Sequence, residues 1–336
     1  MPRVLILMST AKGQNFQFPN STVPALTSPR HLDLTKRIVD EMKNLTTGEL
    51  GSRLGCSASL ASAAVASFAA FVTDPTALSA LSSSYPPLTR PLVAARLLPA
   101  IHTFDGVAFE ALDARNLSPR DLSYACENIR ILDPLYGVLR GSDGVQEYRL
   151  ELGIKVMHTW RETITCKGGK RREAGEAGMT VNGPFPLKKI WKPLVTNSIL
   201  EDCAVHDSSI IFDASSIEYS ELFDPTSAAP TSSPVHIYTC KFTSGGKVLP
   251  GTSLKTARGL FARYCCENNV RSLSDAQGFD LDGFAFEALE EEKASSKNEN
   301  VKRSTITFAD NSRKTKDKPN KERAVDEAQP TKRKKA

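Results

Sequence analysis

The residues best suited to chemistry form a turn, Asp133-Pro134-Leu135-Tyr136-Gly137, which Arg140 follows. Successive backbone N–H groups at a turn and at the start of the next helix bind an anion without any side chain. Gly137 permits close approach of a phosphate, and Arg140 adds a charge-assisted hydrogen bond. Pro134 has no N–H and removes one donor. The pattern predicts a helix-hairpin-helix unit over residues 118–145, with a plain connector and a packed Tyr136 as the alternative.

Other cationic side chains stand beside small residues or on the polar side of an expected element. Lys255 and Arg258 are three residues apart and would share one helix face. Lys12 follows an expected strand, and Arg149 and Lys155 lie on the polar side of another. For each of them alone, an exposed cationic surface is the ordinary alternative. With the turn they give the candidate DNA-binding residues Lys12, Tyr136, Gly137, Arg140, Arg149, Lys155, Lys255 and Arg258.

Other kinds of catalytic or metal site find less support in the sequence. The five histidines have no metal-ligand spacing, and no G-x-S-x-G motif is present. Cys56 has no identifiable base, and Glu218 with Glu267 would serve as general acid and base only if the fold joined them. Ion pairs with arginines are the ordinary role for these two glutamates. We therefore expect no metal and no cofactor, and an enzyme only if Lys12 or Lys255 acts as a nucleophile.

The elements that must position these residues are mixed helices and strands. Strands are expected at residues 3–8, 148–156, 209–214 and 235–242, and helices at 33–45, 57–71, 187–200 and 252–268. Ser118 and Pro119 have the residue types of an N-cap and a first helical position, so a helix should run from there to Leu132. These elements predict a mixed α/β (α+β) single domain, with a mixed sheet and surrounding helices.

Charge divides the chain of 336 residues into two unequal parts. Residues 293–336 hold 14 Lys/Arg and 6 Asp/Glu, and the residues before them hold 29 and 32. The composition predicts a folded domain over residues 1–290 and a disordered basic tail over residues 291–336. Because the domain has a small acidic excess, it must bind nucleic acid through a local cationic patch.

The cysteines, the apolar runs and the last residues of the chain indicate the cellular compartment of the protein. The seven cysteines form no C-x-x-C pair, which predicts reduced thiols in the cytosol and no disulfide framework. Neither apolar run is long enough for a membrane span, and the first is too short for a signal peptide. The run Lys332-Arg333-Lys334-Lys335 suggests nuclear import as the alternative, with the import machinery as a partner, or nonspecific polyanion binding.

Several segments, in order, resemble the YaaA-type peroxide-stress family of bacteria. The matching residues span about 3–287 and include 5–12, 104–107, 130–140, 148–154, Trp191, 216–219, 255–260 and 278–284. Pro134 departs from the family pattern, which usually has Gly there. The resemblance implies a mixed α/β domain with a helix-hairpin-helix unit and a positively charged cleft for double-stranded DNA. It also implies a role in limiting oxidative damage to DNA and protein, linked to the control of free iron.

The expected function is therefore that of a DNA-binding protein of the hydrogen peroxide stress response, with contacts to the duplex backbone. The first alternative is an enzyme that acts on a phosphate-bearing or damaged nucleic acid through a cleft lysine. The second is a protein whose basic tail alone binds nucleic acid, because the tail carries all of the net positive charge.

Overall fold

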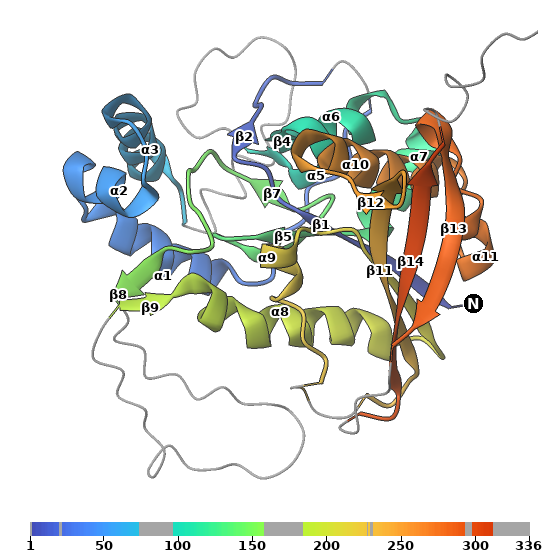
Figure 1. The fold of residues 1–336 in the computed structure, drawn as a ribbon. Coiled ribbons are helices and arrows are strands. Elements are labelled where there is room, and N and C mark those ends of the chain that lie inside the picture. Colours follow the sequence, from blue (N-terminus) through green and yellow to red (C-terminus); the bar gives the residue numbers. More distant parts are fainter. Residues whose placement is uncertain are drawn as a thin grey trace, which may run out of the picture.

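The computed structural model describes residues 2–19, 22–73, 97–157, 184–226, 228, 231–292 and 298–311 (Figure 1). Its main sheet has eight strands in the order β13-β14-β11-β10-β1-β5-β6, with β12 paired to β11. The neighbouring strands β14, β11, β10, β1 and β5 are all parallel. The bounds are β1 (Arg3–Ser9), β5 (Ile129–Asp133), β6 (Gly137–Arg140), β10 (Ser209–Asp213), β11 (Val235–Ser244), β12 (Lys247–Val248), β13 (Phe284–Glu291) and β14 (Val301–Asp310).

Short strand pairs lie outside this sheet. They are β2 (Gly13–Gln14) with β4 (Phe104–Asp105), β3 (Leu98–Pro99) with β7 (Gly144–Val145), and β8 (Lys155–Met157) with β9 (Pro184–Pro186). The first of these pairs holds the segment after β1 against the segment before α6. It therefore shapes the region just beyond the end of the central strand.

Helices cover both sides of the main sheet (Figure 1). One side carries α5 (Ala100–Thr103), α6 (Val107–Leu112), α7 (Pro119–Asn128) and α10 (Gly251–Glu267). The other carries α1 (Leu32–Lys43) and α8 (Leu187–Ala204), with α2 (Thr47–Leu54) and α3 (Ala58–Ala70) beside α1. The remaining elements are α9 (Ile217–Ser220), α11 (Leu273–Gln277), η1 (Ala114–Asn116) and η2 (Leu281–Gly283).

The local sequence explains why these elements form. The run Val4–Met8 is buried throughout, as expected for a central parallel strand with helices on both faces. In α7, Ser118 Oγ accepts a hydrogen bond from Asp121 N and Pro119 is the first helical residue, as predicted. Leu34, Ile38 and Met42 of α1 are buried at helical spacing, which agrees with the helix predicted over residues 33–45. The predicted mixed α/β class is confirmed.

The predicted helix-hairpin-helix unit is not confirmed. Helix α7 ends at Asn128, and Ile129–Asp133 is a strand that pairs with β1 and β6. The turn therefore joins two antiparallel strands of the main sheet. Every residue of β5 is buried, and a short, fully buried strand has the same run of apolar residues as a buried helix. This ambiguity explains why the sequence favoured a helix to Leu132.

The predicted strand over residues 148–156 is also wrong for most of its length. Only Lys155–Met157 forms a strand, and residues 148–154 have no regular secondary structure. Apolar and polar residues alternate in this segment, and the alternation has a physical basis. The apolar residues Tyr148, Leu150, Leu152 and Ile154 are all buried. Their side chains pack into the core without a neighbouring strand to complete a ladder.

The predicted start of the tail at residue 291 is wrong. Strand β14 pairs with β11 along its whole length and with β13 on its other side, so it lies inside the sheet. The apolar residues of β14, such as Ile306 and Phe308, stand in a segment rich in Lys and polar residues, which hid the strand. The folded part thus reaches Asp310. The run Lys332–Lys335 lies outside the described residues.

Among the described helices, no single one is both long and apolar enough to cross a membrane. The pair α2 and α3 meets the criteria of length and composition only when the two are taken together, and it is bent by 110°.

Candidate functional site

A cavity lies where the order of the central strands changes direction. The chain passes from β1 to β5 on one side and from β10 to β11 on the other, so the two connections leave in opposite directions. In open parallel sheets such a switch point opens a crevice at the carboxyl ends of the strands, which is a common ligand site. Residues just after β1 and just after β10 here line a cavity of about 490 Å³. We call it the β1–β10 cavity.

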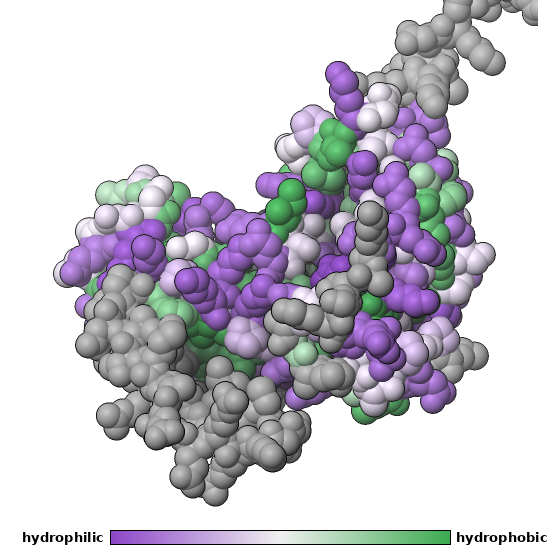
Figure 2. Space-filling model, turned by 60° about the horizontal axis from the view of Figure 1, so that its bottom comes forward, coloured by the Kyte–Doolittle hydropathy of each residue, from purple (hydrophilic) through white to green (hydrophobic). Residues whose placement is uncertain are grey.

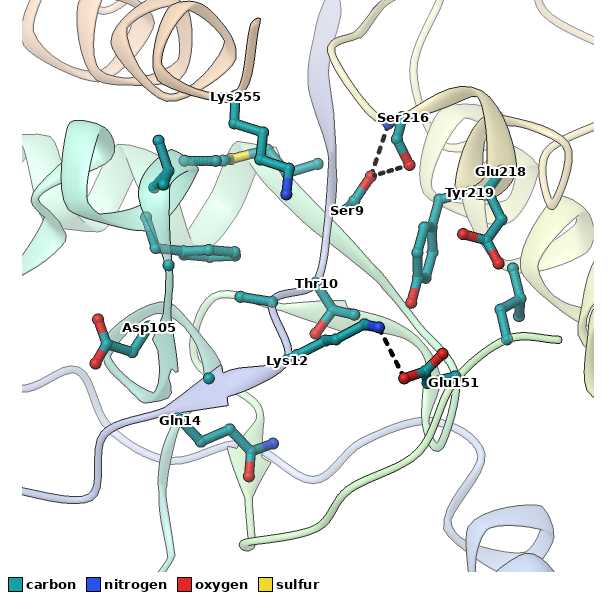
Figure 3. A pocket seen from close by; sticks show the side chains of 18 of the residues that line it. Ser9, Thr10, Lys12, Gln14, Asp105, Glu151, Ser216, Glu218, Tyr219 and Lys255 are labelled. Carbon is teal, nitrogen blue, oxygen red and sulfur yellow. Dashed lines mark hydrogen bonds and ion pairs between the residues drawn. The ribbon is translucent and has the colours of Figure 1, made fainter. Parts of the chain in front are cut away.

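The side chains of this cavity come from distant parts of the chain (Figure 3). Ser9 is the last residue of β1, Lys12 follows that strand, and Asp105 precedes α6. The irregular segment after β7 adds Tyr148, Arg149 and Glu151, α9 adds Glu218 and Tyr219, and α10 adds Lys255 and Arg258. The tertiary structure alone brings these segments together.

Lys12 and Glu151 form an ion pair at the cavity, with 2.7 Å between Nζ and Oε1 (Figure 3). The Lys12 side chain is 66% exposed, so solvent screens this pair and its contribution to stability is small. A weakly held lysine can exchange its carboxylate partner for an incoming anion. Lys12 is therefore available to a ligand.

Two serines join the end of β1 to the start of α9. The backbone N–H of Ser216 donates to Ser9 Oγ at 2.7 Å, and Ser9 Oγ donates to Ser216 Oγ at 3.2 Å (Figure 3). These bonds fix the position of the short helix that carries Glu218 and Tyr219. Burial raises the pKa of Tyr219, and the nearby carboxylate of Asp133 raises it further, so the phenol stays protonated.

Two arginines of the cavity have unsatisfied donors. Among the described residues, the Nε atoms of Arg149 and Arg258 are buried and have no hydrogen-bond partner. Burial lowers the pKa of Arg258 and the carboxylate of Asp213 opposes that shift, but a guanidinium stays charged in proteins. A buried donor without an acceptor destabilises the fold unless something else satisfies it. An anionic ligand in the cavity would supply the missing acceptor.

A buried carboxylate lies behind the cavity wall. Asp133 Oδ1 accepts hydrogen bonds from the N–H groups of Leu135 and Tyr136 at 2.8 and 2.9 Å, and Oδ2 accepts one from the hydroxyl of Tyr148. Burial raises the pKa of Asp133, and burial also raises that of Tyr148. The turn N–H groups predicted to bind phosphate are thus occupied by the carboxylate of the same turn.

The structure divides the predicted DNA-binding residues into two groups. Lys12, Arg149, Lys255 and Arg258 all line the β1–β10 cavity. The other four residues, Tyr136, Gly137, Arg140 and Lys155, do not line it.

The three residues around the turn have structural partners instead. Tyr136 is buried, and its hydroxyl accepts a hydrogen bond from the backbone N–H of Gln146. Gly137 lies against the ring of Trp191. The Arg140 guanidinium donates to Asp143 Oδ1 at 2.9 and 3.1 Å, and to a backbone carbonyl. The turn is part of the core.

Sequence reasoning left some cavity residues out of the predicted site. Ser9, Ser216, Tyr148 and Tyr219 all lie in segments that carried the family resemblance, which was the signal that pointed to them. The acid–base pair considered as the less common role of Glu218 and Glu267 does not form at the cavity, and Glu267 has the ion pair with an arginine that was the expected role. Glu218 lines it, whereas the Glu267 carboxylate accepts from Arg263 at 2.8 Å on α10.

Metal and thiol chemistry have little support in the part of the chain that the structure describes. No group of three or more His, Cys, Asp or Glu residues there could hold a metal ion. The six cysteines of this part are free, and burial raises the pKa of Cys126 to about 12 and of Cys203 to about 11. Such thiols are protonated and unreactive near neutral pH. Cys265 and Cys266 are buried in α10.

Comparison with known proteins gives one consistent result. The family described as peroxide stress protein YaaA matches residues 4–166 and 173–290. A UPF0246 protein of Polynucleobacter necessarius is 27% identical over 289 residues, which cover 85% of this chain and 95% of the relative. UPF0246 proteins of Phenylobacterium zucineum and Clostridium botulinum are 28% and 26% identical, over 84% of this chain and 90% and 94% of their own lengths. With most of its length matched, the chain belongs to the peroxide stress protein YaaA family.

Proposed function

We propose that this chain protects DNA under peroxide stress by binding the phosphate backbone of duplex DNA at the mouth of the β1–β10 cavity. One observation carries the proposal: Lys12, Arg149, Lys255 and Arg258 converge from three separate segments on one cavity, where two guanidinium Nε atoms have no acceptor among the described residues. Buried donors beside exposed lysines suit an anion that has several oxygen atoms, such as phosphate. A bound protein would also limit the access of peroxide-derived oxidants to the sugars beneath it.

The charge of the cavity sets the expected strength of binding. Its four cations face the carboxylates of Asp105, Glu151 and Glu218, so the positive excess is small and local. Contacts of this kind position a protein on DNA without reading the bases. Neutralising three or four phosphates should give a slope of about −3 to −4 for log K against log salt concentration.

The test measures the anisotropy of a labelled duplex with the full chain at several salt concentrations. Lys12→Glu and Lys255→Glu should each weaken binding by about tenfold and make the salt slope shallower by about one unit. Lys247→Glu is the matched control, because Lys247 is exposed on β12 and does not line the cavity. An equal loss of affinity in all three variants would contradict binding of the duplex at this cavity.

A shortened chain separates the cavity from the basic end of the sequence. Residues 312–336 hold 10 Lys/Arg and 4 Asp/Glu, so they alone could bind a polyanion. A chain that ends at Asn311 keeps the whole main sheet, unlike one that ends at residue 290 and lacks β14. The proposal requires that this shortened chain still binds the duplex and still responds to Lys255→Glu. If it does not bind at all, residues 312–336 are the DNA-binding part.

An enzyme that acts on damaged nucleic acid is the second candidate. It is favoured by the cavity volume of about 490 Å³, which lies in the range of small-molecule sites and exceeds what a backbone contact needs. In this case Lys12 or Lys255 would attack the sugar aldehyde of an abasic site, with loss of water to form an imine. Borohydride would reduce that imine to a stable adduct, which mass spectrometry detects. No adduct with wild type, or an adduct that survives in both Lys12→Ala and Lys255→Ala, would dismiss this candidate.

A further inference from the structure

A second cavity of about 700 Å³ lies on the α8 side of the sheet. Its floor is the face of β11 and β14 that carries Thr239, Lys241, Arg303 and Thr305. Its walls come from the first half of α8, from α9 with the turn after it, and from the start of α10 (Figure 1). Arg258 lines this cavity as well as the β1–β10 cavity, so the two are neighbours. We call it the β11–β14 cavity.

The floor carries two cations, Lys241 and Arg303, and one carboxylate, Asp213, which is paired with Thr239 and accepts hydrogen bonds from Ser215 and Ser220. Neither Lys241 nor Arg303 takes part in an ion pair with the described residues. Thr239 and Thr305 are directly paired, and the two cations stand two residues to either side of that pair. Two residues of strand span about 7 Å, so both long side chains can reach a ligand atom above the threonines. The floor thus offers two charged groups and two hydroxyl donors to one anion.

The wall cations differ from those of the floor, because they are paired. Lys192 Nζ lies 2.8 Å from Asp224 Oδ2, and Lys188 pairs with Glu221. These ion pairs join α8 to the turn after α9. The backbone N–H of Asp224 also donates to Thr196 Oγ1 of α8 at 2.9 Å. The wall is therefore held in place independently of the floor.

The rim carries apolar side chains that are open to solvent. Ile217 is 81% exposed and Val248 is 54% exposed, and both line the cavity. On the face turned forward in Figure 2, hydrophilic residues predominate and hydrophobic ones form small separate patches. Two exposed aliphatic side chains beside a cationic floor would gain from contact with an apolar group of a ligand.

We propose that the β11–β14 cavity binds a small organic phosphate, with the phosphate on Lys241, Arg303, Thr239 and Thr305 and its apolar body between Ile217 and Val248. A phosphate monoester has three terminal oxygen atoms and nearly two negative charges, which suits the donor set of the floor. This site is separate from the DNA contacts proposed at the β1–β10 cavity and does not depend on them.

The experiment titrates the full chain with phenyl phosphate, inorganic phosphate and benzoate by isothermal calorimetry. Phenyl phosphate should bind, and inorganic phosphate should bind at least about tenfold more weakly because it lacks the apolar body. Benzoate tests the same cavity for a carboxylate ligand. If benzoate binds as well as phenyl phosphate, the assignment to a phosphate is overturned.

Matched variants locate the binding. Arg303→Ala and Lys241→Gln should each lower the affinity for phenyl phosphate by about tenfold. Lys302 is the residue before Arg303 on β14, and Lys302→Ala should leave this affinity unchanged. Lys302 is outside the cavity, as is Val205, which is 80% exposed. Ile217→Asp should therefore weaken binding and Val205→Asp should not.

The result that overturns the proposal is binding that these floor and rim variants do not change, or none at millimolar phenyl phosphate. Loss of phenyl phosphate binding in Lys12→Glu would place the ligand in the β1–β10 cavity and overturn it too. Lys241 is exposed, so Lys241→Gln should fold. This variant therefore still tests the site if Arg303→Ala fails to fold. DNA affinity is a separate readout, so either proposal can fail alone.

Discussion

Replacement of Gly137 by alanine separates the structural role of the 133–137 turn from a role in binding. Gly137 has a φ of +75°, in the left-handed region. A Cβ at this position would lie 2.4 Å from Cε3 and 2.6 Å from Cζ3 of Trp191. The indole of Trp191 is fully buried, and its Nε1 donates to the carbonyl of Pro134 at 2.8 Å. The ring therefore cannot move away without breaking a bond to the same turn.

The expected cost has two parts. A left-handed conformation costs about 1–2 kcal/mol for a residue with a Cβ. The overlap with Trp191 adds about 1–3 kcal/mol, as is usual when an extra carbon is forced into a packed core. Gly137→Ala should therefore lower the free energy of unfolding by about 2–5 kcal/mol.

Urea unfolding, followed by circular dichroism, measures this loss. The matched control is Gly246→Ala, because Gly246 has a φ of +77° and open space around its Cβ position. That variant should lose only the backbone part, about 1–2 kcal/mol. In a Trp191→Phe background the cost of Gly137→Ala should fall by about 1 kcal/mol or more, since the smaller ring relieves the overlap.

A structural role for Gly137 is refuted if Gly137→Ala and Gly246→Ala lose the same stability. It is also refuted if Gly137→Ala keeps its stability and loses affinity for duplex DNA. The second outcome would mean that Gly137 approaches a phosphate, as the sequence first suggested.

Three further predictions concern other parts of the fold. Arg140→Ala should lower the unfolding free energy by about 1–3 kcal/mol in urea, because it removes donors from buried Asp143, while the DNA affinity of the folded variant stays unchanged. Burial lowers the pKa of His102 to about 4 from about 6.5 in the unfolded chain. The unfolded state thus binds more protons, so wild-type stability should fall as the pH drops from 6.5 to 4, and unfolding of His102→Leu should lack that component. Ser118→Ala should lower the unfolding free energy by about 1 kcal/mol, because the N-cap bond to Asp121 N is lost, and the fold should otherwise be kept.

Local patterns in the sequence sufficed for much of the fold. The apolar run Val4–Met8 is the central strand, Ser118-Pro119 begins α7, and the helical spacing in α1 places its apolar residues inside. Each of these features depends on neighbouring residues, whose types set the preferred backbone and the buried face. Lys12 and the Lys255–Arg258 pair were also found in this way, since a strand end and a helix face are local properties.

Contacts between distant segments decided the rest. Residues 129–132 suit a buried helix or a buried strand equally, and only their pairing with β1 made them β5. The residues of β14 stand in a segment whose basic composition did not indicate a strand. Only their pairing with β11 and β13 makes them one. The turn at 133–137 was predicted to bind a ligand because its residues suit an anion. The N–H groups of Leu135 and Tyr136 instead donate to Asp133 of the same turn, which is a local contact, and the distant Trp191 packs against Gly137.

The candidate site shows the same division. The sequence by itself determined which cations the chain has and which of them stand at the ends of elements. Only the tertiary structure placed Arg149 and Arg258 at one cavity and left Arg140 outside it. The physical reason is that charge and residue type are local properties, whereas the convergence of side chains on one cavity depends on segments as far apart in the sequence as those of Lys12 and Arg258.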